Sequence, residues 1–418
     1  EGEHRSSMEE DYFADTYQEA REKFLKAAKA AGAKIESLEL KGQKGPEGET
    51  LAIDIAVLGD VNNSNPESLL LHTSGVHGPE GFAGSAIQTW FLTQLAKNDE
   101  LRNELGRKKG TKIALVHAVN PYGMAWIRRY NENNVDLNRN FLLDPKQSHA
   151  DIQNVDYPLV HEIFKPSSYG YFGNAHFMLR LCKVVAGFSF NFKRFKQAVA
   201  GGQYDFKDGF FYGGDRLQPG PQMLVDAFKT IGLNKDNKQL DTVLLLDIHT
   251  GLGKNGVDIL ITMDEKICGR LGDIYGKSHI QPPTGDMYKV LGSTLDIVES
   301  LAPTTAKNLL SVCQEFGTIP MLGLNLGWML PTSLKSMIVR LPVLNALLCD
   351  GVLNAMLEEL VAWCKNPKTS LAHKCKDRLK AAFYDQSTSW KRRILHRGRT
   401  VLCQSLSHIG ITKHGGLC

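Results

Sequence analysis

The sequence predicts an α/β protein with a mixed, mostly parallel central sheet and helices on both faces. Two observations lead to this prediction. Apolar, strand-like runs alternate with helical segments along the chain, as in sheets that are covered on both sides. The 418 residues also supply enough length for a large buried core. In such sheets ligands bind at the carboxyl ends of the strands, so functional side chains are expected there.

The first part of the chain is expected to begin with an amphipathic helix over residues 9–32, because its apolar residues recur at helical spacing. Residues 51–59 alternate like a strand, and residues 67–75 follow after a polar turn as its expected partner. A helix over residues 83–95 and a buried strand over residues 112–123, ending in an Asn-Pro turn, come next.

Later segments continue the alternation of strands and helices. Residues 131–151 are loop-like, residues 176–200 are predicted to be helical, and residues 201–220 form a loop rich in glycine and aromatic residues. Further strands are predicted at 241–253, 257–263 and 308–317, and further helices at about 340–364 and 369–383.

The chain has no internal repeat, low-complexity tract or long linker, which favours one folded domain. Residues 1–48 are expected to form a helix and a lead-in strand packed on the central part, residues 49–340. Residues 341–418 are expected to be a helical extension of the same domain.

Charge and hydropathy exclude some partners. The net charge is only +4. The basic residues near the C-terminal end lack regularly interleaved aromatic residues, so we interpret them as a solvated face and expect no nucleic-acid partner. These residues are Lys391, Arg392, Arg393, Arg397 and Arg399. No apolar run approaches the ~18 to 20 residues that span a bilayer, so no membrane insertion is expected.

Compartment and oligomeric state stay open. The eight cysteines include no C-x-x-C pair, which argues against a thiolate zinc site. The chain begins at Glu1 without an initiating Met or a signal peptide, and it carries one glycosylation sequon at Asn62. Cytoplasmic and secreted locations are both compatible with these features.

The chemistry-bearing residues start at the turn after the strand at 67–75. His77 and Glu80 lie three residues apart there, and His249 lies near the end of the strand at 241–253. Two histidines and one glutamate are a common ligand set of hydrolytic zinc and leave a position for water. Asp247, two residues before His249, is a candidate hydrogen-bond partner for its imidazole.

A second group of polar residues lies in residues 120–141. Guanidinium groups offer bidentate donors that match carboxylates and developing oxyanions, and Arg128, Arg129 and Arg139 supply three of them. Asp136 is a candidate partner for one of these arginines. A solvated polar loop is the alternative, but Leu137 and Phe141 flank Asn138 and Arg139 and favour an inward-facing segment.

These motifs together resemble the zinc carboxypeptidase superfamily, which includes peptide carboxypeptidases and aspartoacylase-like deacylases. The resemblance rests on the ordered strings H-G-P-E, N-P-x-G, R-R-x-N-x-x-N-V-D-L-N-R-N-F, D-I-H-T-G and Q-E-F-G, and it runs from about Leu51 to about Pro320. It is strongest to a carboxypeptidase-like branch catalogued as a domain of unknown function. It implies a zinc carboxypeptidase-like catalytic domain over residues 49–340 and one bound zinc ion.

The resemblance also implies a role for each matching residue. The zinc ligands would be His77, Glu80 and His249, and Asn138 with Arg139 would hold a substrate carboxylate. Arg128 or Arg129 would stabilise the oxyanion, with Arg129 preferred because its R-Y context matches the deacylases. Glu315 would be the general base, with a structural ion pair as the alternative.

The chain departs from peptide carboxypeptidases in two respects. Their substrate-binding tyrosine has no fixed counterpart here: Tyr288 lies in a suitable region, and Tyr212 is a rival. The interval from the arginine pair to Asn138 and Arg139 is shorter than in digestive carboxypeptidases.

The expected activity is zinc-dependent cleavage of an amide bond next to a free carboxylate, on a peptide substrate. A deacylase of N-acyl amino acids is the alternative from the same site. A catalytically silent binding protein of the same fold is a third hypothesis.

Overall fold

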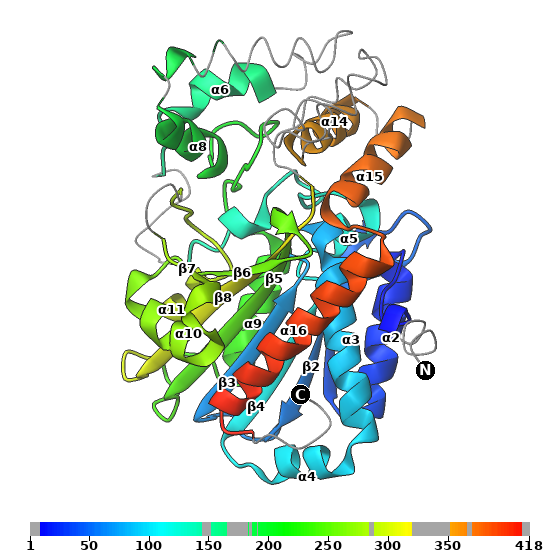
Figure 1. Cartoon of the computed structure of the whole chain (residues 1–418), viewed down its shortest axis with the longest axis vertical. Coiled ribbons are helices and arrows are strands. Elements are labelled where there is room, and N and C mark those ends of the chain that lie inside the picture. The colour runs from blue at the N-terminus through cyan, green and yellow to red at the C-terminus, as the bar shows by residue number, and fades with distance from the viewer. Residues whose placement is uncertain are drawn as a thin grey trace.

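The computed structural model describes residues 9–143, 152–164, 183, 186–189, 191–283, 288–319, 352–365 and 370–411. Its centre is an eight-stranded sheet in the order β1-β2-β4-β3-β5-β8-β6-β7 (Figure 1). The strands are β1 (Lys34–Lys44), β2 (Thr50–Gly59), β3 (Ser68–Ser74), β4 (Thr111–His117), β5 (Thr242–Asn255), β6 (Asp258–Ile261), β7 (Ile280–Gln281) and β8 (Asn308–Gly317).

The middle of the sheet is parallel and its margins are mixed. Strands β4, β3, β5 and β8 run parallel, whereas β2 pairs antiparallel with both β1 and β4, and β6 pairs antiparallel with β8. The predicted fold class is therefore confirmed. The predicted pairing of residues 51–59 with 67–75 is wrong, because β4 lies between β2 and β3. The helix after β3 carries the chain back to add β4 as a parallel neighbour of β3.

Alternating apolar side chains on the strands build one core on each face of the sheet. On one face, Leu70, Ile113 and Leu244 pack with helices α2 (Tyr17–Ala30), α3 (Gly81–Lys97), α10 (Cys268–Tyr275) and α16 (Thr388–His408). On the other face, Leu69, Leu71 and Val243 pack with α9 (Pro219–Ile231) and α11 (Asp296–Leu301). This two-sided burial explains why the parallel strands are continuously apolar in sequence.

A third apolar cluster covers the carboxyl ends of the central strands (Figure 1). It joins residues of α6 (Tyr157–Phe164), α8 (Phe192–Ala200), α14 (Val352–Lys365) and α15 (Ser370–Phe383) with Phe210 and Phe211. Segments far apart in sequence thus pack together on the edge where ligands bind in parallel sheets.

Several predicted elements have different bounds. Of the helix expected at 176–200, the described part contains α8, and most of the remainder lies outside the described residues. The helix expected at 340–364 is described as α14, residues 320–351 being outside the described range. The Asn-Pro turn opens helix α5 (Pro121–Trp126), because Asn120 caps the Gly123 N–H and Pro121 fits the first helical turn. Helix α4 (Asp99–Arg107) was not predicted.

In the described part of the chain, no helix combines the length and the apolar character needed to cross a membrane.

Candidate metal centre

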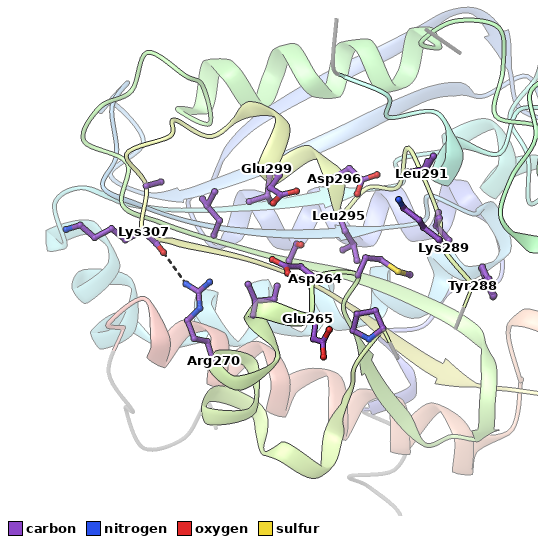
Figure 2. A pocket seen from close by; sticks show the side chains of 18 residues that line it. Asp264, Glu265, Arg270, Tyr288, Lys289, Leu291, Leu295, Asp296, Glu299 and Lys307 are labelled. Carbon is purple, nitrogen blue, oxygen red and sulfur yellow. Dashed lines mark hydrogen bonds between the residues drawn. The ribbon is translucent and has the colours of Figure 1, made fainter. Parts of the chain in front are cut away.

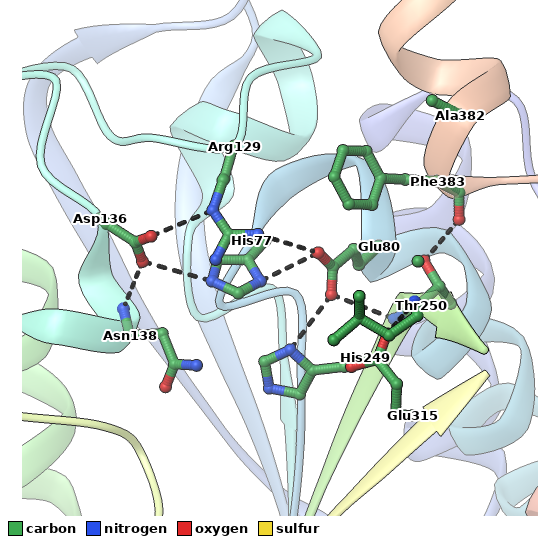
Figure 3. A network of polar contacts seen from close by, with 12 residues as sticks. His77, Glu80, Arg129, Asp136, Asn138, His249, Thr250, Glu315, Ala382 and Phe383 are labelled. Atoms are coloured by element: carbon green, nitrogen blue, oxygen red, sulfur yellow. Dashed lines mark hydrogen bonds and ion pairs between the residues drawn. The ribbon is translucent and has the colours of Figure 1, made fainter. Parts of the chain in front are cut away.

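The ends of β3 and β5 bring the three predicted ligands to one point (Figure 3). His77 and Glu80 belong to the turn and short 3-10 helix (Gly78–Glu80) that follow β3, and His249 lies on β5. One ligand atom from each of the three lies within 4.8 Å of the others, and all three side chains are buried. The structure therefore contains a His/Glu/His group that could hold a metal ion.

In each imidazole of this group, both ring nitrogens lie within hydrogen-bond distance of a carboxylate oxygen. The Nδ1 atom of His77 lies 2.9 Å from Glu80 Oε1, and its Nε2 atom lies 3.2 Å from Asp136 Oδ1. The Nδ1 atom of His249 lies 3.1 Å from Glu80 Oε2, and its Nε2 atom lies 2.7 Å from Asp247 Oδ2. Asp136 and Asp247 thus fix both rings with Nδ1 facing Glu80, which is how carboxylates orient imidazoles that bind zinc.

The donor set fits zinc. Two Nδ1 atoms and the Glu80 carboxylate converge. Among the described residues, the one arginine or lysine ion-paired with Glu80 is Arg129, whose Nη1 atom lies 3.6 Å from Glu80 Oε1. Zinc prefers nitrogen and oxygen donors of this kind, with three protein ligands in catalytic sites. Burial raises the pKa of Glu80, but the two adjacent imidazoles outweigh burial and hold that pKa below its usual range, so the carboxylate is ionised and available.

The neighbouring strand contributes Glu315. His249 on β5 and Glu315 on β8 are direct partners across the parallel pair, so their side chains lie side by side at the same edge. The Leu252 N–H donates a 2.8 Å hydrogen bond to Glu315 Oε1 and orients the carboxylate. Burial, reinforced by the charge of Glu80, raises the pKa of Glu315 to about 7.

The two adjacent arginines of the 120–141 segment have different surroundings. Arg129 donates from Nε to Asp136 Oδ2 at 3.0 Å and reaches Glu80, so its guanidinium lies at the metal centre. Arg128 is 1% exposed and donates to Glu359 on α14 at 2.6 Å, while its guanidinium lies 4.1 Å from the ring centre of Trp363. Arg128 therefore contacts the helices above the sheet rather than the three ligands.

We expect the Arg128 contact to support stability. Changing Glu359 to Gln leaves the Arg128 guanidinium buried without a carboxylate, and removing one partner of a buried pair costs about 3–5 kcal/mol. Urea unfolding should therefore give a free energy of unfolding lower by about that amount. The exposed pair of Lys207 and Asp215 is the control: Asp215→Asn should cost under about 1 kcal/mol. Equal, small effects of both variants would contradict this account.

Asn138 and Arg139 lie beside the metal centre. The Asn138 N–H donates to Asp136 Oδ1 at 3.0 Å, and the Thr294 N–H donates to Asn138 Oδ1 at 3.0 Å. The Asn138 side-chain nitrogen donates to no described residue. Arg139 is 2% exposed and donates to the carbonyl oxygens of Asn138 and Ala200.

Among the described residues, the buried Arg139 guanidinium has no carboxylate partner and its Nε atom has no hydrogen-bond acceptor. Its guanidinium carbon lies 5.3 Å from the ring centre of Phe211, and that of Arg129 lies 5.1 Å from the same ring. Phe211 thus packs against both guanidiniums. A buried cation with an unused donor suits an anionic group of a ligand, because burying an unpaired charge is otherwise unfavourable.

Tyr288 lines a pocket whose lining includes none of the three ligands. This pocket has a volume of about 620 Å³ and is also lined by Lys289, Asp296 and Glu299 (Figure 2). The rival Tyr212 is 3% exposed and packs in the core under β3 and α9. Neither tyrosine forms a hydrogen bond with a predicted metal ligand in the described residues.

Several neighbours of the site were not predicted from the sequence. The hydroxyl groups of Thr73 and Thr294 donate to Asp247, the former at 2.6 Å. The Thr250 N–H donates to Glu80 Oε2 at 3.1 Å, and the Thr250 hydroxyl donates to the Phe383 carbonyl at the end of α15. Thr250, directly after His249, and Thr73, four residues before His77, lie close to predicted ligands in the sequence. Thr294 and Phe383 come from distant segments.

Asp247, which is hydrogen-bonded to His249, should control metal affinity. Burial lowers the pKa of His249, but Asp247 and Glu80 outweigh burial and hold that pKa well above its usual range. Metal binding then has to displace a proton, so affinity should rise by roughly tenfold per pH unit while the pH lies below that pKa. Asp247→Asn should weaken zinc binding by about 10- to 100-fold and flatten this pH dependence.

Zinc titrations against a competing chelator across the neutral range measure both quantities. Asp226→Asn, an exposed change on α9, is the control and should leave affinity and pH slope unchanged. An unchanged affinity in Asp247→Asn would show that the carboxylate does not act on the ligand.

Fold and site together define an α/β protein with a candidate metal centre at the carboxyl edge of its sheet. A family model described as "Protein of unknown function (DUF2817)" matches residues 13–397, and the chain belongs to that family. This confirms the predicted branch without an assigned function. No curated protein sequence matches significantly.

Solved structures of carboxypeptidases are similar to the chain. Carboxypeptidase A from Helicoverpa armigera is 12% identical with a TM-score of 0.43, over 89% of this chain and 75% of the other. Thrombin activatable fibrinolysis inhibitor is 12% identical with a TM-score of 0.43, over 73% and 67%. A metallo-carboxypeptidase from Burkholderia cenocepacia is 13% identical with a TM-score of 0.38, over 70% and 58%. Similarity at this level identifies no activity.

Proposed function

We propose that the protein is a zinc-dependent hydrolase that cleaves an amide bond next to a free carboxylate. The observation that carries the proposal is the convergence of His77, Glu80 and His249, with Glu315 beside His249. Bound zinc supplies a Lewis acid that activates water and polarises a carbonyl group. The remaining steps belong to side chains of this chain.

In the proposed mechanism, Glu315 accepts a proton from the attacking water and passes it to the leaving amine. A pKa near 7 suits both transfers, because the group can accept and release a proton near neutral pH. Its carboxylate is held by the Leu252 N–H, which leaves the second oxygen for the water.

Arg129 stabilises the negative charge that develops on the scissile carbonyl. Burial lowers its pKa, but Asp136 and Glu80 outweigh burial and raise it, so the guanidinium stays charged. Asp136 also fixes its orientation through the 3.0 Å hydrogen bond to Nε. Preoriented donors of this kind stabilise a transition state without reorganising during the reaction.

Asn138 and Arg139 bind the carboxylate of the substrate. Two donors without an acceptor among the described residues support this assignment: the side-chain nitrogen of Asn138 and the Nε atom of Arg139. Arg139→Gln should therefore raise KM for substrates with a free carboxylate and have little effect on the corresponding amides. Equal losses on both substrate types would contradict carboxylate binding at this position.

A deacylase of N-acyl amino acids is the second candidate from the same residues. The observation that favours it is the position of Tyr288, which lines another pocket and leaves the implied tyrosine contact of peptide carboxypeptidases without support. The substrate in both cases carries a free carboxylate, so the proposed residue roles are shared.

The proposal is tested by measuring bound metal in purified protein and hydrolysis of two panels, blocked dipeptides and N-acyl amino acids. Stoichiometric zinc with turnover of one panel supports the hydrolase and selects between the two candidates. Zinc-free protein without turnover of either panel after added zinc would instead favour the catalytically silent hypothesis.

A further inference from the structure

A basic groove lies beside α16 and the turn between β5 and β6. It has a volume of about 610 Å³, and we define it by its lining residues: Glu9, Gly256, Val257, Asp258, His279, Arg392, Arg393, His396, Arg397 and Arg399. None of these is a residue of the candidate metal centre.

The groove is strongly cationic. Four arginines face two carboxylates, which leaves a net charge of +2 before either histidine is protonated, compared with +4 for the whole chain. The spacing of the basic residues along α16 places Arg392, His396 and Arg399 on one row and Arg393 and Arg397 on the next. One helix thus presents all four guanidiniums to the same groove.

The arginines differ in how far the protein neutralises them. Arg397 binds Asp258 with two hydrogen bonds of 2.8 and 3.1 Å, and Asp258 also accepts from Gln314. Arg399 lies 3.6 Å from Glu9. Arg393 donates to the neutral amide oxygen of Asn255 at 2.7 Å and forms no ion pair within 4.0 Å with a described carboxylate. Its charge also acts on Asp385, which accepts a 2.9 Å hydrogen bond from the same Asn255.

The backbone is shaped to hold the Arg393 guanidinium. Gly256 has a φ of +67°, and a Cβ atom there would lie 2.5 Å from Arg393 Nε and 2.6 Å from its Cζ. The positive φ favours glycine here, and a Cβ atom would force the planar group to move away from this turn. Arg393 is exposed, and its guanidinium lies against the Gly256 turn with donors left for a ligand.

From these contacts we propose that the basic groove binds a phosphate-type oxyanion, with Arg393 as its principal ligand. Guanidiniums match phosphate oxygens with paired, charge-assisted hydrogen bonds. The Arg397–Asp258 pair forms one wall of the site, and His396 and His279 add imidazole groups at its margin. The same chemistry serves a soluble phosphate compound or a phosphate group on a lipid surface.

The test uses the full chain and calorimetric titration with inorganic phosphate and pyrophosphate at constant ionic strength, with chloride as the reference. Arg393→Gln should weaken binding on the order of 10- to 100-fold, the effect of losing a charged hydrogen-bonding partner. Arg107→Gln, an exposed change of equal charge on α4, should change it by less than about twofold. Gly256→Ala, which displaces the guanidinium without removing a charge, should weaken binding by a smaller factor than Arg393→Gln does.

Two further arms separate the groove from the metal centre and identify the source of the phosphate. Arg139→Gln, next to the metal centre, should leave phosphate binding intact. Flotation with vesicles containing phosphatidic acid reports on a lipid source, and binding in either the soluble or the vesicle arm supports the proposal. It is overturned if neither arm exceeds chloride, if Arg107→Gln weakens binding as much as Arg393→Gln, or if Arg139→Gln abolishes binding.

Discussion

Changing Glu315 to Gln is expected to lower kcat by about 10²- to 10⁴-fold with unchanged zinc content, the typical contribution of a general base. Glutamine preserves the shape of the side chain and can still accept the hydrogen bond from the Leu252 N–H. It cannot accept a proton. The expected loss is therefore chemical, and KM and thermal stability should stay close to those of the unchanged protein.

The pH profile gives an independent measure of the same group. Since burial and the charge of Glu80 raise the pKa of Glu315 to about 7, the ionised base is lost as the pH falls through neutrality. The pH profile of kcat should therefore show an acidic limb in the unchanged protein, and this limb should be absent from the residual activity of Glu315→Gln. A bound cation would lower the pKa of Glu315 and shift the acidic limb to lower pH.

Glu299→Gln, on the surface of α11, is the matched control and should retain full activity. A Glu315→Gln variant that binds zinc fully and hydrolyses substrate at the unchanged rate would contradict a general-base role.

The second large effect is expected at the metal ligands. His77→Ala leaves Glu80 and His249 as the two remaining ligands and should abolish stoichiometric zinc binding and hydrolysis. The loss of zinc affinity should exceed the roughly 10- to 100-fold loss that follows from substituting a residue hydrogen-bonded to a metal ligand. Asp136 keeps its hydrogen bond from Arg129 Nε in this variant, so no buried carboxylate is left unpaired.

Metal analysis after dialysis, together with an unfolding curve, measures this prediction. His408→Ala, an exposed histidine at the end of α16, controls for loss of an imidazole as such and should keep its zinc. Full zinc occupancy in folded His77→Ala protein would exclude the proposed ligand set.

Sequence reasoning succeeded where a local pattern has one structural solution. The continuously apolar strands predicted a sheet covered on both faces, because only burial on both sides makes such a run favourable. The same reasoning put His77, Glu80, His249 and Glu315 at strand ends on one edge. Parallel strands bring their carboxyl ends to that edge whatever their order in the sheet.

Local patterns were less informative where distant segments meet. Arg128 and Arg129 are adjacent in sequence and chemically identical. Packing against α14 places Arg128 next to Glu359, whereas the hydrogen bond with Asp136 holds Arg129 beside Glu80. The order of β2, β4 and β3 was missed for a related reason, since the pairing of strands is decided by the crossover connections rather than by the strands themselves.

The sequence alone determined the fold class, the family resemblance and the candidate ligands, because periodicity and short motifs are local properties of the chain. Tertiary structure decided that Asp136 orients the His77 imidazole, that Arg128 contacts α14 while Arg129 lies at the metal centre, and which basic residues of α16 share one groove. These contacts join side chains from different elements, such as Arg128 and Glu359, which are 231 residues apart and meet only when the strands and helices pack. That difference is physical: periodicity is set by neighbours along the chain, whereas charge pairing and burial are set by neighbours in space.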